Sequence, residues 1–290
     1  MNPLVSIIIP TYNRSKLIHE RALKSAIAQT YANKEIIVVN DGSTEQYNIG
    51  LPAWYYKPWM VNRGGSAARN YGVSQAHGKY IVFIDDDNEL DKDFIKKTVE
   101  FAEKYDHFDA VTTWRAIQYP DRKELAKVKE TELPAIDWGW LIHRDVFDKI
   151  RYDESIWGDE DADFGIQFRA NRLMYFVLNE YLQTAYVPPV EEEVTSNTFP
   201  NERRLRGLAN FLSKNLGYYK GNERRYILRL AGRNYLRAGH YWVGVSYFSR
   251  SLQAMPNWKT FKHFFFACLG WNWYDKYMTF EEKKNGSSNH

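Results

Sequence analysis

Three short runs of apolar residues stand out in the early part of the chain. They span residues 5–9, 35–39 and 80–84, and β-branched side chains are frequent in them. Because the apolar residues are contiguous rather than alternating, we expect both faces of each run to be buried, as in a strand of a parallel sheet. The pattern therefore predicts three buried strands.

Apolar residues at helical spacing lie between these runs. They predict one helix over residues 15–30, with Ser15 at its N-cap, and a second over residues 66–76, which Gly78 ends. Alternating strands and helices are typical of an α/β fold with a doubly wound, mostly parallel sheet and right-handed crossovers. We therefore expect ligands at the carboxyl ends of the strands.

Helical and extended patterns continue after the third run. Residues 91–105 predict a helix and residues 110–113 a strand. Residues 115–135 are charged and weakly periodic, so they predict a mobile loop.

A run of prolines and glutamates over residues 188–193 marks a boundary, and residues 194–201 follow it as a linker or lid. We expect a catalytic domain over residues 1–195 and a helical extension over residues 196–290. Within the extension, residues 203–215 and 224–255 predict a helical hairpin, with a turn at Gly239 in the second segment.

Charge is distributed unevenly between these parts. Residues 201–290 carry 16 Lys and Arg against 5 Asp and Glu, whereas residues 1–200 carry 23 against 31. An acidic body suits a divalent cation, and a basic surface attracts phosphates, anionic lipid or nucleic acid. The single cysteine, Cys268, excludes an internal disulfide, and no long apolar stretch predicts a signal peptide or a membrane span. We expect a cytoplasmic protein, with the membrane face as a further possible place.

Distinctive polar residues follow each predicted strand. Asn40, Asp41, Gly42 and Ser43 follow the second strand, and Asp85, Asp86, Asp87 and Asn88 follow the third. The residues after the first strand are Pro10, Thr11, Tyr12, Asn13 and Arg14. These three segments are expected to converge on one edge of the sheet.

The consecutive aspartates 85–87 repel one another unless a cation or hydrogen-bond donors offset their charge. Oxygen ligands of this kind favour Mg²⁺ or Mn²⁺, and alternation places Asp85 and Asp87 on the same side. The alternative is a turn that leads to a helix opened by Asp91.

Three further segments carry candidate chemistry. Small residues between Asn62 and Asn70, Gly65 among them, could present backbone N–H groups to a phosphate. Glu160 and Asp161 lie at the start of a predicted helix, where one carboxylate could act as a base, although a solvated acidic turn is the alternative. Trp138, Gly139 and Trp140 form either a sugar-stacking platform or part of the core.

Taken together, these motifs resemble family 2 glycosyltransferases of the GT-A fold, in the order in which that family carries them, over residues 3–190. The resemblance implies that Thr11, Tyr12 and Asp41 surround the base and ribose of a nucleotide sugar. The other residues that it places at the donor are Pro10, Asn13, Arg14, Asn62, Gly65, Arg69, Asp85 and Asp86.

The same resemblance implies a metal site and a catalytic base. The family's F-L-D-x-D-D motif reads here from Phe83 to Asn88, with Asn88 in place of the last aspartate, so Asp87 and then Asp85 are the expected ligands of Mn²⁺ or Mg²⁺. The family's E-D motif corresponds to Glu160 and Asp161, which makes Asp161 the expected base. Apart from the resemblance, stacking of the rings on a sugar makes Trp138, Gly139 and Trp140 the expected acceptor contacts.

The expected reaction is an inverting displacement in which an acceptor hydroxyl attacks a nucleoside-diphosphate sugar, a UDP-sugar by resemblance. The Q-x-x-R-W motif of processive relatives is missing at Gln167, so transfer of one residue or a few is expected. Partners would be the donor and a carbohydrate or lipid-linked acceptor. The aromatic and basic residues 261–274 would contact a membrane surface or pack on the catalytic domain or on a second subunit.

Two alternatives remain open from the sequence. A metal-dependent nucleotidyltransferase would also use a doubly wound sheet, but its glycine-rich loop after the first strand is missing. A non-catalytic carbohydrate- or nucleic-acid-binding protein would use the basic aromatic tail, but it leaves the paired aspartate motifs unexplained.

Overall fold

The computed structural model describes residues 2–50, 53–105, 108–127, 136–187, 202–269, 274 and 276–278. Its contacts divide the chain into two compact units, Met1–Glu193 and Val194–His290. We call them unit 1 and unit 2.

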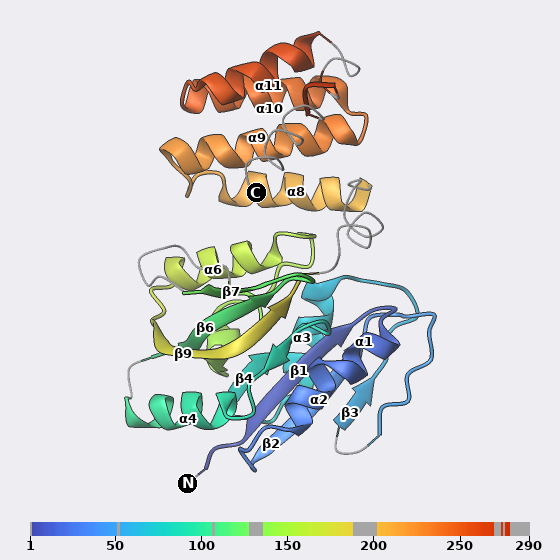
Figure 1. Ribbon diagram of the computed structural model, residues 1–290, viewed down its shortest axis with the longest axis vertical. Coiled ribbons are helices and arrows are strands. Elements are labelled where there is room, and N and C mark those ends of the chain that lie inside the picture. Colours follow the sequence, from blue (N-terminus) through green and yellow to red (C-terminus); the bar gives the residue numbers. More distant parts are fainter. Residues whose placement is uncertain are drawn as a thin grey trace. The chain divides into compact units, whose positions relative to one another are not determined.

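Unit 1 is built on a mixed sheet with the strand order β3-β2-β1-β4-β8-β6-β9-β5, and β7 pairs with β6 at one side (Figure 1). The first four strands in this order are parallel, and the antiparallel pairs begin where β4 meets β8. The strands are β1 (Val5–Thr11), β2 (Lys34–Asn40), β3 (Ala53–Tyr56), β4 (Tyr80–Phe83), β5 (Glu89–Leu90), β6 (Ala110–Gln118), β7 (Lys123–Ala126), β8 (Trp140–His143) and β9 (Tyr175–Tyr186). The predicted α/β fold class is confirmed.

Helices cover both faces of this sheet because consecutive residues of each strand point to opposite sides. Ile7 and Ile9 of β1 join a core with Ile18 of α1 and Phe94 of α4, whereas Ile8 joins a second core with α3 and α6. The helices are α1 (Ser15–Glu20), α2 (Ala22–Ile27), α3 (Gly65–Gln75), α4 (Phe94–Lys104), α5 (Val146–Lys149) and α6 (Glu160–Ala170). Burial on both faces explains why the strands are continuously apolar.

The helix predicted over residues 15–30 is wrong in its continuity and its cap. It forms two short helices, and the backbone leaves helical values at Arg21, with φ −123° and ψ −87°. The Arg21 guanidinium donates to the carbonyl oxygen of Asp87 at 2.9 Å, a tertiary contact that local periodicity does not reveal. Arg14 occupies the N-cap position, and Ser15 is the first helical residue.

The mobile loop predicted over residues 115–135 is wrong for its first part. Strand β6 continues to Gln118, and β7 pairs with it in antiparallel register from Arg115–Ala126 to Gln118–Lys123. Residues 128–135 lie outside the described part of the chain. The helix predicted from Asp91 begins at Phe94, because the Asp91 carboxylate accepts the backbone N–H of Asp93 in a turn before it.

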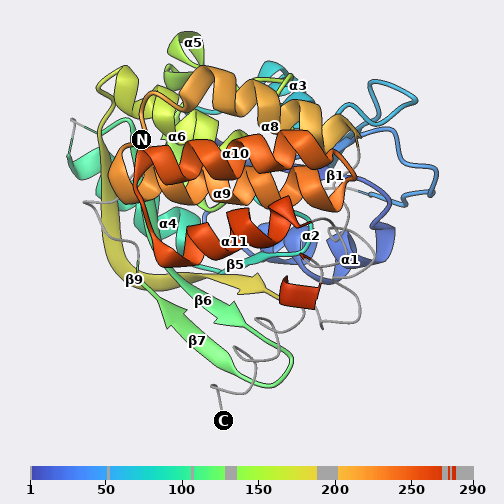
Figure 2. The ribbon, with the colours of Figure 1, turned by 90° about the horizontal axis from the view of Figure 1, so that it is seen from above.

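Unit 2 consists of helices in its described part, as the sequence predicts (Figure 2). They are α8 (Glu202–Asn215), α9 (Gly221–Arg237), α10 (Tyr241–Ala254) and α11 (Trp258–Cys268). Helices α9 and α10 form a hairpin through Gly239, whose φ of +84° suits the predicted turn. The predicted boundary at residues 188–193 and the linker at 194–201 lie outside the described residues.

None of the helices in the described part of the chain combines the length and apolar character that a bilayer crossing requires.

Candidate active site

The polar segments after β1, β2 and β4 meet at one edge of the sheet. The hydroxyl of Thr11, at the end of β1, donates to Asp86 after β4 at 2.8 Å. The backbone N–H of Asn13 donates to the Ser43 hydroxyl after β2 at 2.8 Å. The parallel register of the three strands brings their carboxyl ends together, as expected.

Arg14 bridges two of the consecutive aspartates at this edge. One of its guanidinium nitrogens lies 3.0 Å from Asp86 and 2.9 Å from Asp87. Burial raises the pKa of Asp86 to about 6, with a further increase from the charge of Asp87. The pKa of Asp87 is raised by burial and then by the charge of Asp85. Arg14 therefore offsets only part of the negative charge gathered here.

Arg69 of α3 connects the third aspartate to the start of α6. Its guanidinium lies 2.7 Å from Asp85 and 3.3 Å from Glu160, and only 10% of its side chain is exposed. Burial lowers the pKa of Arg69, but the carboxylates outweigh it, so the group stays charged. A Cβ at Gly65 would lie 2.7 Å from the Arg69 guanidinium and 3.2 Å from the Glu160 carboxylate. Gly65 thus leaves room for this ion pair.

Asp161 lies beside this ion pair at the N-terminus of α6. Burial, followed by the charges of Glu160 and Asp137, raises its pKa to about 6, although the backbone N–H of Ala162 donates to it at 2.8 Å. Such a carboxylate is ionised at neutral pH and is more basic than an ordinary aspartate. It is therefore suited to take a proton from a hydroxyl.

Arg115 and Asp137 form a second ion pair near Asp161, and sequence reasoning missed both. Their two side chains make paired hydrogen bonds of 2.7 Å and 3.0 Å, and Gln183 of β9 accepts from the same guanidinium at 3.1 Å. Arg115 fell in the segment predicted as a loop, and Asp137 stood alone beside Trp138. No local pattern could have joined residues so far apart in the chain.

The structure assigns Trp138 and Trp140 to the core, which is the alternative that the sequence left open. Each is only 3% exposed, so neither ring face is available as a sugar platform. Trp140 belongs to β8 between β4 and β6, and the Arg115 guanidinium lies 4.3 Å from the ring centroid of Trp138. Gly139 has a φ of +73° and donates to the Phe83 carbonyl at 2.9 Å. Burial in the sheet thus removes the basis for an acceptor contact.

Asp41 fastens a loop with both of its carboxylate oxygens. One accepts the indole N–H of Trp59 at 2.6 Å and the backbone N–H of Arg63 at 2.7 Å. The other accepts the backbone N–H of Gly64 at 2.7 Å. These bonds hold the start of the segment from Asn62 to Asn70 against the turn after β2.

The remaining candidate donor residues lie around the same edge. Tyr12 is 43% exposed and follows β1 directly. Asn13 has a φ of +50°, and its side-chain oxygen accepts the backbone N–H of Thr44 at 2.9 Å. Pro10 and Asn62 are half-buried.

The carboxylates at this edge fit a divalent cation of the Mg²⁺ or Mn²⁺ type. The side chains of Asp85 and Asp87 are 31% and 32% exposed, so each can reach a ligand from solvent. In the described residues, no group of three or more His, Cys, Asp or Glu is arranged to hold a metal. These cations usually take one or two protein carboxylates and complete their shell with water and phosphate oxygens. A pair of aspartates therefore matches the requirement.

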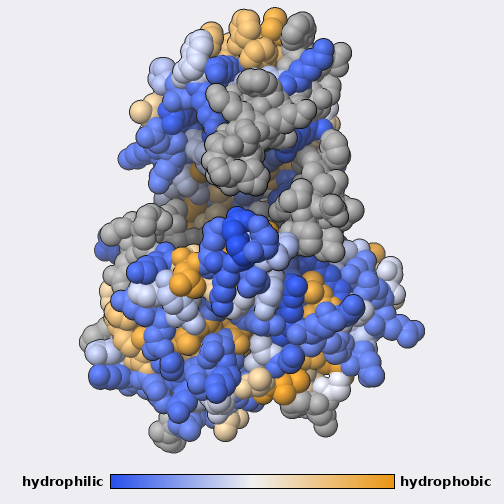
Figure 3. Space-filling model, viewed as in Figure 1, coloured by the Kyte–Doolittle hydropathy of each residue, from blue (hydrophilic) through white to orange (hydrophobic). Residues whose placement is uncertain are grey.

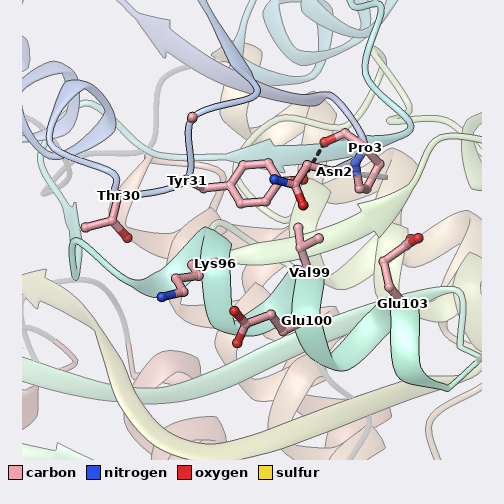
Figure 4. A pocket seen from close by; sticks show the side chains of 9 residues that line it. Asn2, Pro3, Thr30, Tyr31, Lys96, Val99, Glu100 and Glu103 are labelled. Carbon is pink, nitrogen blue, oxygen red and sulfur yellow. Dashed lines mark hydrogen bonds between the residues drawn. The ribbon is translucent and has the colours of Figure 1, made fainter.

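A cavity of about 340 Å³ lies elsewhere in unit 1 (Figure 4). Its lining includes Tyr31, Lys96 and Glu100, and the Tyr31 hydroxyl donates to the Pro3 carbonyl at 2.7 Å. Pro3 and Tyr31 precede β1 and β2, so this cavity lies at the amino ends of the strands, away from the aspartates.

The chain belongs to glycosyl transferase family 2, whose family model matches residues 6–165. This agrees with the family that the sequence motifs resemble.

Several relatives of the chain are bacterial proteins named as glycosyltransferases. An uncharacterized glycosyltransferase of Rickettsia conorii is 38% identical over 119 residues, which are 39% of this chain and 19% of the relative. WcaA of Escherichia coli K12, named for colanic acid biosynthesis, is 44% identical over 95 residues, or 30% and 34% of the two chains. EpsJ of Bacillus subtilis is 29% identical over 194 residues, or 57% and 56%. The chain thus spans between about a fifth and about half of the length of these relatives.

Solved structures share the fold at low identity. Residues 1–349 of Staphylococcus aureus TarS, solved with UDP-GlcNAc, match with a TM-score of 0.60 and 18% identity, over 93% of this chain and 89% of that chain. The mannosyltransferase PcManGT of Pyrobaculum calidifontis, solved with GDP-Man and Mn²⁺, matches with a TM-score of 0.53 and 16% identity, over 90% and 78%. Unit 1 therefore has a GT-A-like fold.

Proposed function

We propose that the chain is an inverting glycosyltransferase that moves a sugar from a nucleoside-diphosphate sugar to an acceptor hydroxyl. The observation that carries the proposal is the placement of Asp161: a half-buried carboxylate whose pKa is raised to about 6, next in the chain to Glu160, which shares the Arg69 guanidinium with Asp85 at the strand ends. A single displacement requires a base for the acceptor hydroxyl and carboxylates that hold a cation, and charged side chains link the two here.

In this reaction Asp161 accepts the proton of the acceptor hydroxyl as its oxygen attacks the anomeric carbon. The bond from that carbon to the diphosphate breaks on the opposite face, so the anomeric configuration inverts. Arg69 holds the Glu160 carboxylate at 3.3 Å, next in the chain to Asp161, and the charge of Glu160 raises the pKa of Asp161. Asp137, half-buried and bonded through both of its carboxylate oxygens to Arg115, adds to the negative charge near Asp161 and raises its pKa.

Asp87 and Asp85, whose side chains are partly exposed, would hold Mn²⁺ or Mg²⁺ through their carboxylate oxygens. When bound, such a cation stabilises the negative charge of the departing diphosphate, so no second carboxylic acid is needed to protonate it. Tyr12 is exposed beside this edge and is suited to stack on the nucleotide base. Asp41, with Asn62 and Gly65, shapes the loop over the donor.

A UDP-sugar is the donor that we propose. TarS was solved with UDP-GlcNAc and PcManGT with GDP-Man, and both ligands are nucleoside-diphosphate sugars. The name of WcaA supports an acceptor of the polysaccharide type, and a lipid-linked glycan fits the same chemistry. We assign catalysis to residues 1–195 and regard residues 196–290 as an extension.

A screen of nucleoside diphosphates and their sugars by thermal shift, with and without Mn²⁺, identifies the donor. Product analysis with the stabilising donor then tests the reaction. Release of a nucleoside diphosphate supports the proposal, whereas release of pyrophosphate would indicate a nucleotidyltransferase. No donor turnover, combined with steeply salt-dependent binding of nucleic acid, would favour a non-catalytic binding protein.

A further inference from the structure

Helix α11 of unit 2 buries one face and exposes apolar residues on the other. Thr260, His263 and Ala267 are buried, at the spacing of a single helical face. The apolar residues of the opposite face are Trp258, Phe261, Phe265 and Leu269, with 69%, 43%, 47% and 49% exposure. We call these four residues the α11 aromatic face.

The rings of this face form a continuous strip. The ring centroids of Trp258 and Phe261 lie 5.4 Å apart, and those of Phe261 and Phe265 lie 6.3 Å apart. Figure 3 shows hydrophobic residues gathered in unit 2 where Figure 1 places α11. Contiguous exposed apolar surface of this kind marks a site of contact with another apolar phase or partner.

Positive charge surrounds the face. Lys259 and Lys262 lie on α11, which has no acidic residue, and the Lys262 ammonium is 5.9 Å from the Trp258 ring centroid. On the inner side, burial and then the charges of Arg229, Arg233 and Lys259 lower the pKa of His263 to about 3. The histidine is therefore neutral, chiefly because it is buried, and the neighbouring cations disfavour its charged form further.

This charge decides between the occupants of the face. A symmetric contact with a second copy would bring Lys259 and Lys262 against the same lysines, with no carboxylate from α11 to pair with them. A lipid surface with anionic headgroups is complementary to both the aromatic rings and the positive charge. The rings enter the headgroup boundary, and the lysines reach the phosphates above it.

We propose that the α11 aromatic face docks unit 2 on a membrane surface that contains anionic lipid, with α11 lying in the plane of the interface. Trp258, Phe261 and Phe265 supply the apolar contact, and Lys259 and Lys262 supply the electrostatic attraction. This activity is separate from sugar transfer and does not depend on it.

Sedimentation of the full chain with vesicles tests the proposal. We expect binding to vesicles of phosphatidylcholine mixed with phosphatidylglycerol, little binding to phosphatidylcholine alone, and weaker binding at high salt, where the charges are screened. Equal binding to both vesicle types, or no binding to either, overturns the proposal.

Variants locate the contact. Trp258→Ser/Phe261→Ser/Phe265→Ser should lower partitioning onto anionic vesicles at least about tenfold, because each aromatic side chain withdraws from an apolar phase. Trp54→Ser, which removes an aromatic residue of unit 1 that is 57% exposed, should leave partitioning unchanged. Because the three substituted side chains are exposed, thermal melting should show an intact fold.

A charge variant tests the electrostatic part of the membrane contact independently. Lys259→Glu/Lys262→Glu should lose the preference for anionic vesicles, while Lys16→Glu/Lys24→Glu in unit 1 should keep it. If the aromatic variant binds vesicles like the parent and light scattering shows that it has changed from dimer to monomer, the face is a self-association surface and the proposal is wrong.

Discussion

Replacing Asp161 by asparagine should stabilise the fold while abolishing sugar transfer. Asparagine keeps the size of the side chain and an oxygen that can accept the backbone N–H of Ala162. In the parent chain this N–H donates to the Asp161 carboxylate at 2.8 Å. It removes the charge that burial, Glu160 and Asp137 all disfavour. The change therefore separates the catalytic role of the carboxylate from its cost to stability.

The size of the effect follows from the pKa of Asp161, which rises from 3.8 to about 6 in the folded chain. Well below pH 3.8, Asp161 is protonated in both states and has no effect. As the pH rises from about 4 to about 6, only the unfolded chain releases the proton, so the folded state loses stability progressively. Above about pH 7 the cost is constant, at most about 3 kcal/mol and about 1–2 kcal/mol after allowance for solvent screening.

Urea unfolding of the parent and of Asp161→Asn measures this difference. At about pH 8 the variant should be more stable by about 1–2 kcal/mol, and the gap should shrink towards about pH 5. Asp145→Asn makes the same chemical change at a side chain that is 75% exposed and should alter stability little at either pH. If Asp161→Asn is less stable at the higher pH, or its gain does not change with pH, the conclusion that the fold disfavours the charge of Asp161 is incorrect.

Three other predictions concern the same edge of the sheet. Turnover should rise as the pH increases through about 6, because the base must be ionised, and a flat profile from pH 5 to 8 would contradict this assignment. Gly65→Ala should lower turnover about tenfold or more, because the added methyl group displaces the Arg69–Glu160 ion pair. Gly50 has open space around it, so Gly50→Ala should leave turnover unchanged, and equal rates for the two variants would refute the steric argument. Asp41→Ala should speed tryptic cleavage after Arg63 and destabilise the fold by about 3 kcal/mol, since it leaves three loop donors without their acceptor. Unchanged cleavage would contradict the conclusion that Asp41 holds this loop.

The strands that carry the site could be predicted because their signal is local. β1, β2 and β4 are contiguous apolar runs, and the polar residues that follow them mark the functional edge of the sheet. The order of strands and polar segments along the sequence was therefore enough to predict that Thr11, Asp41 and Asp86 lie at one edge of the sheet.

The short strands could not be predicted, because tertiary pairing forms them. β5 has only two residues and pairs with β9, and β3 exposes Trp54 and Tyr55 at the edge of the sheet. Neither segment has a run long enough to establish a period. The helical periodicity of residues 15–30 also did not predict the break at Arg21.

Ion pairs between distant segments were the other gap. Arg69 joins Asp85 and Glu160 across 16 and 91 positions, and Arg115 reaches Asp137 across 22. Local patterns identify each residue type but not its partner, so the network around Asp161 emerges only from the folded chain.

Titration of UDP into the protein with and without Mn²⁺ tests the central claim most directly, namely that the aspartates after β4 bind a nucleoside diphosphate through a divalent cation. We predict that Mn²⁺ tightens UDP binding at least about tenfold, or about 1.4 kcal/mol, in the parent chain and in the control Asp145→Ala, but not in Asp87→Ala. Equal affinity with and without the metal in the parent, or an undiminished metal effect in Asp87→Ala, would contradict it.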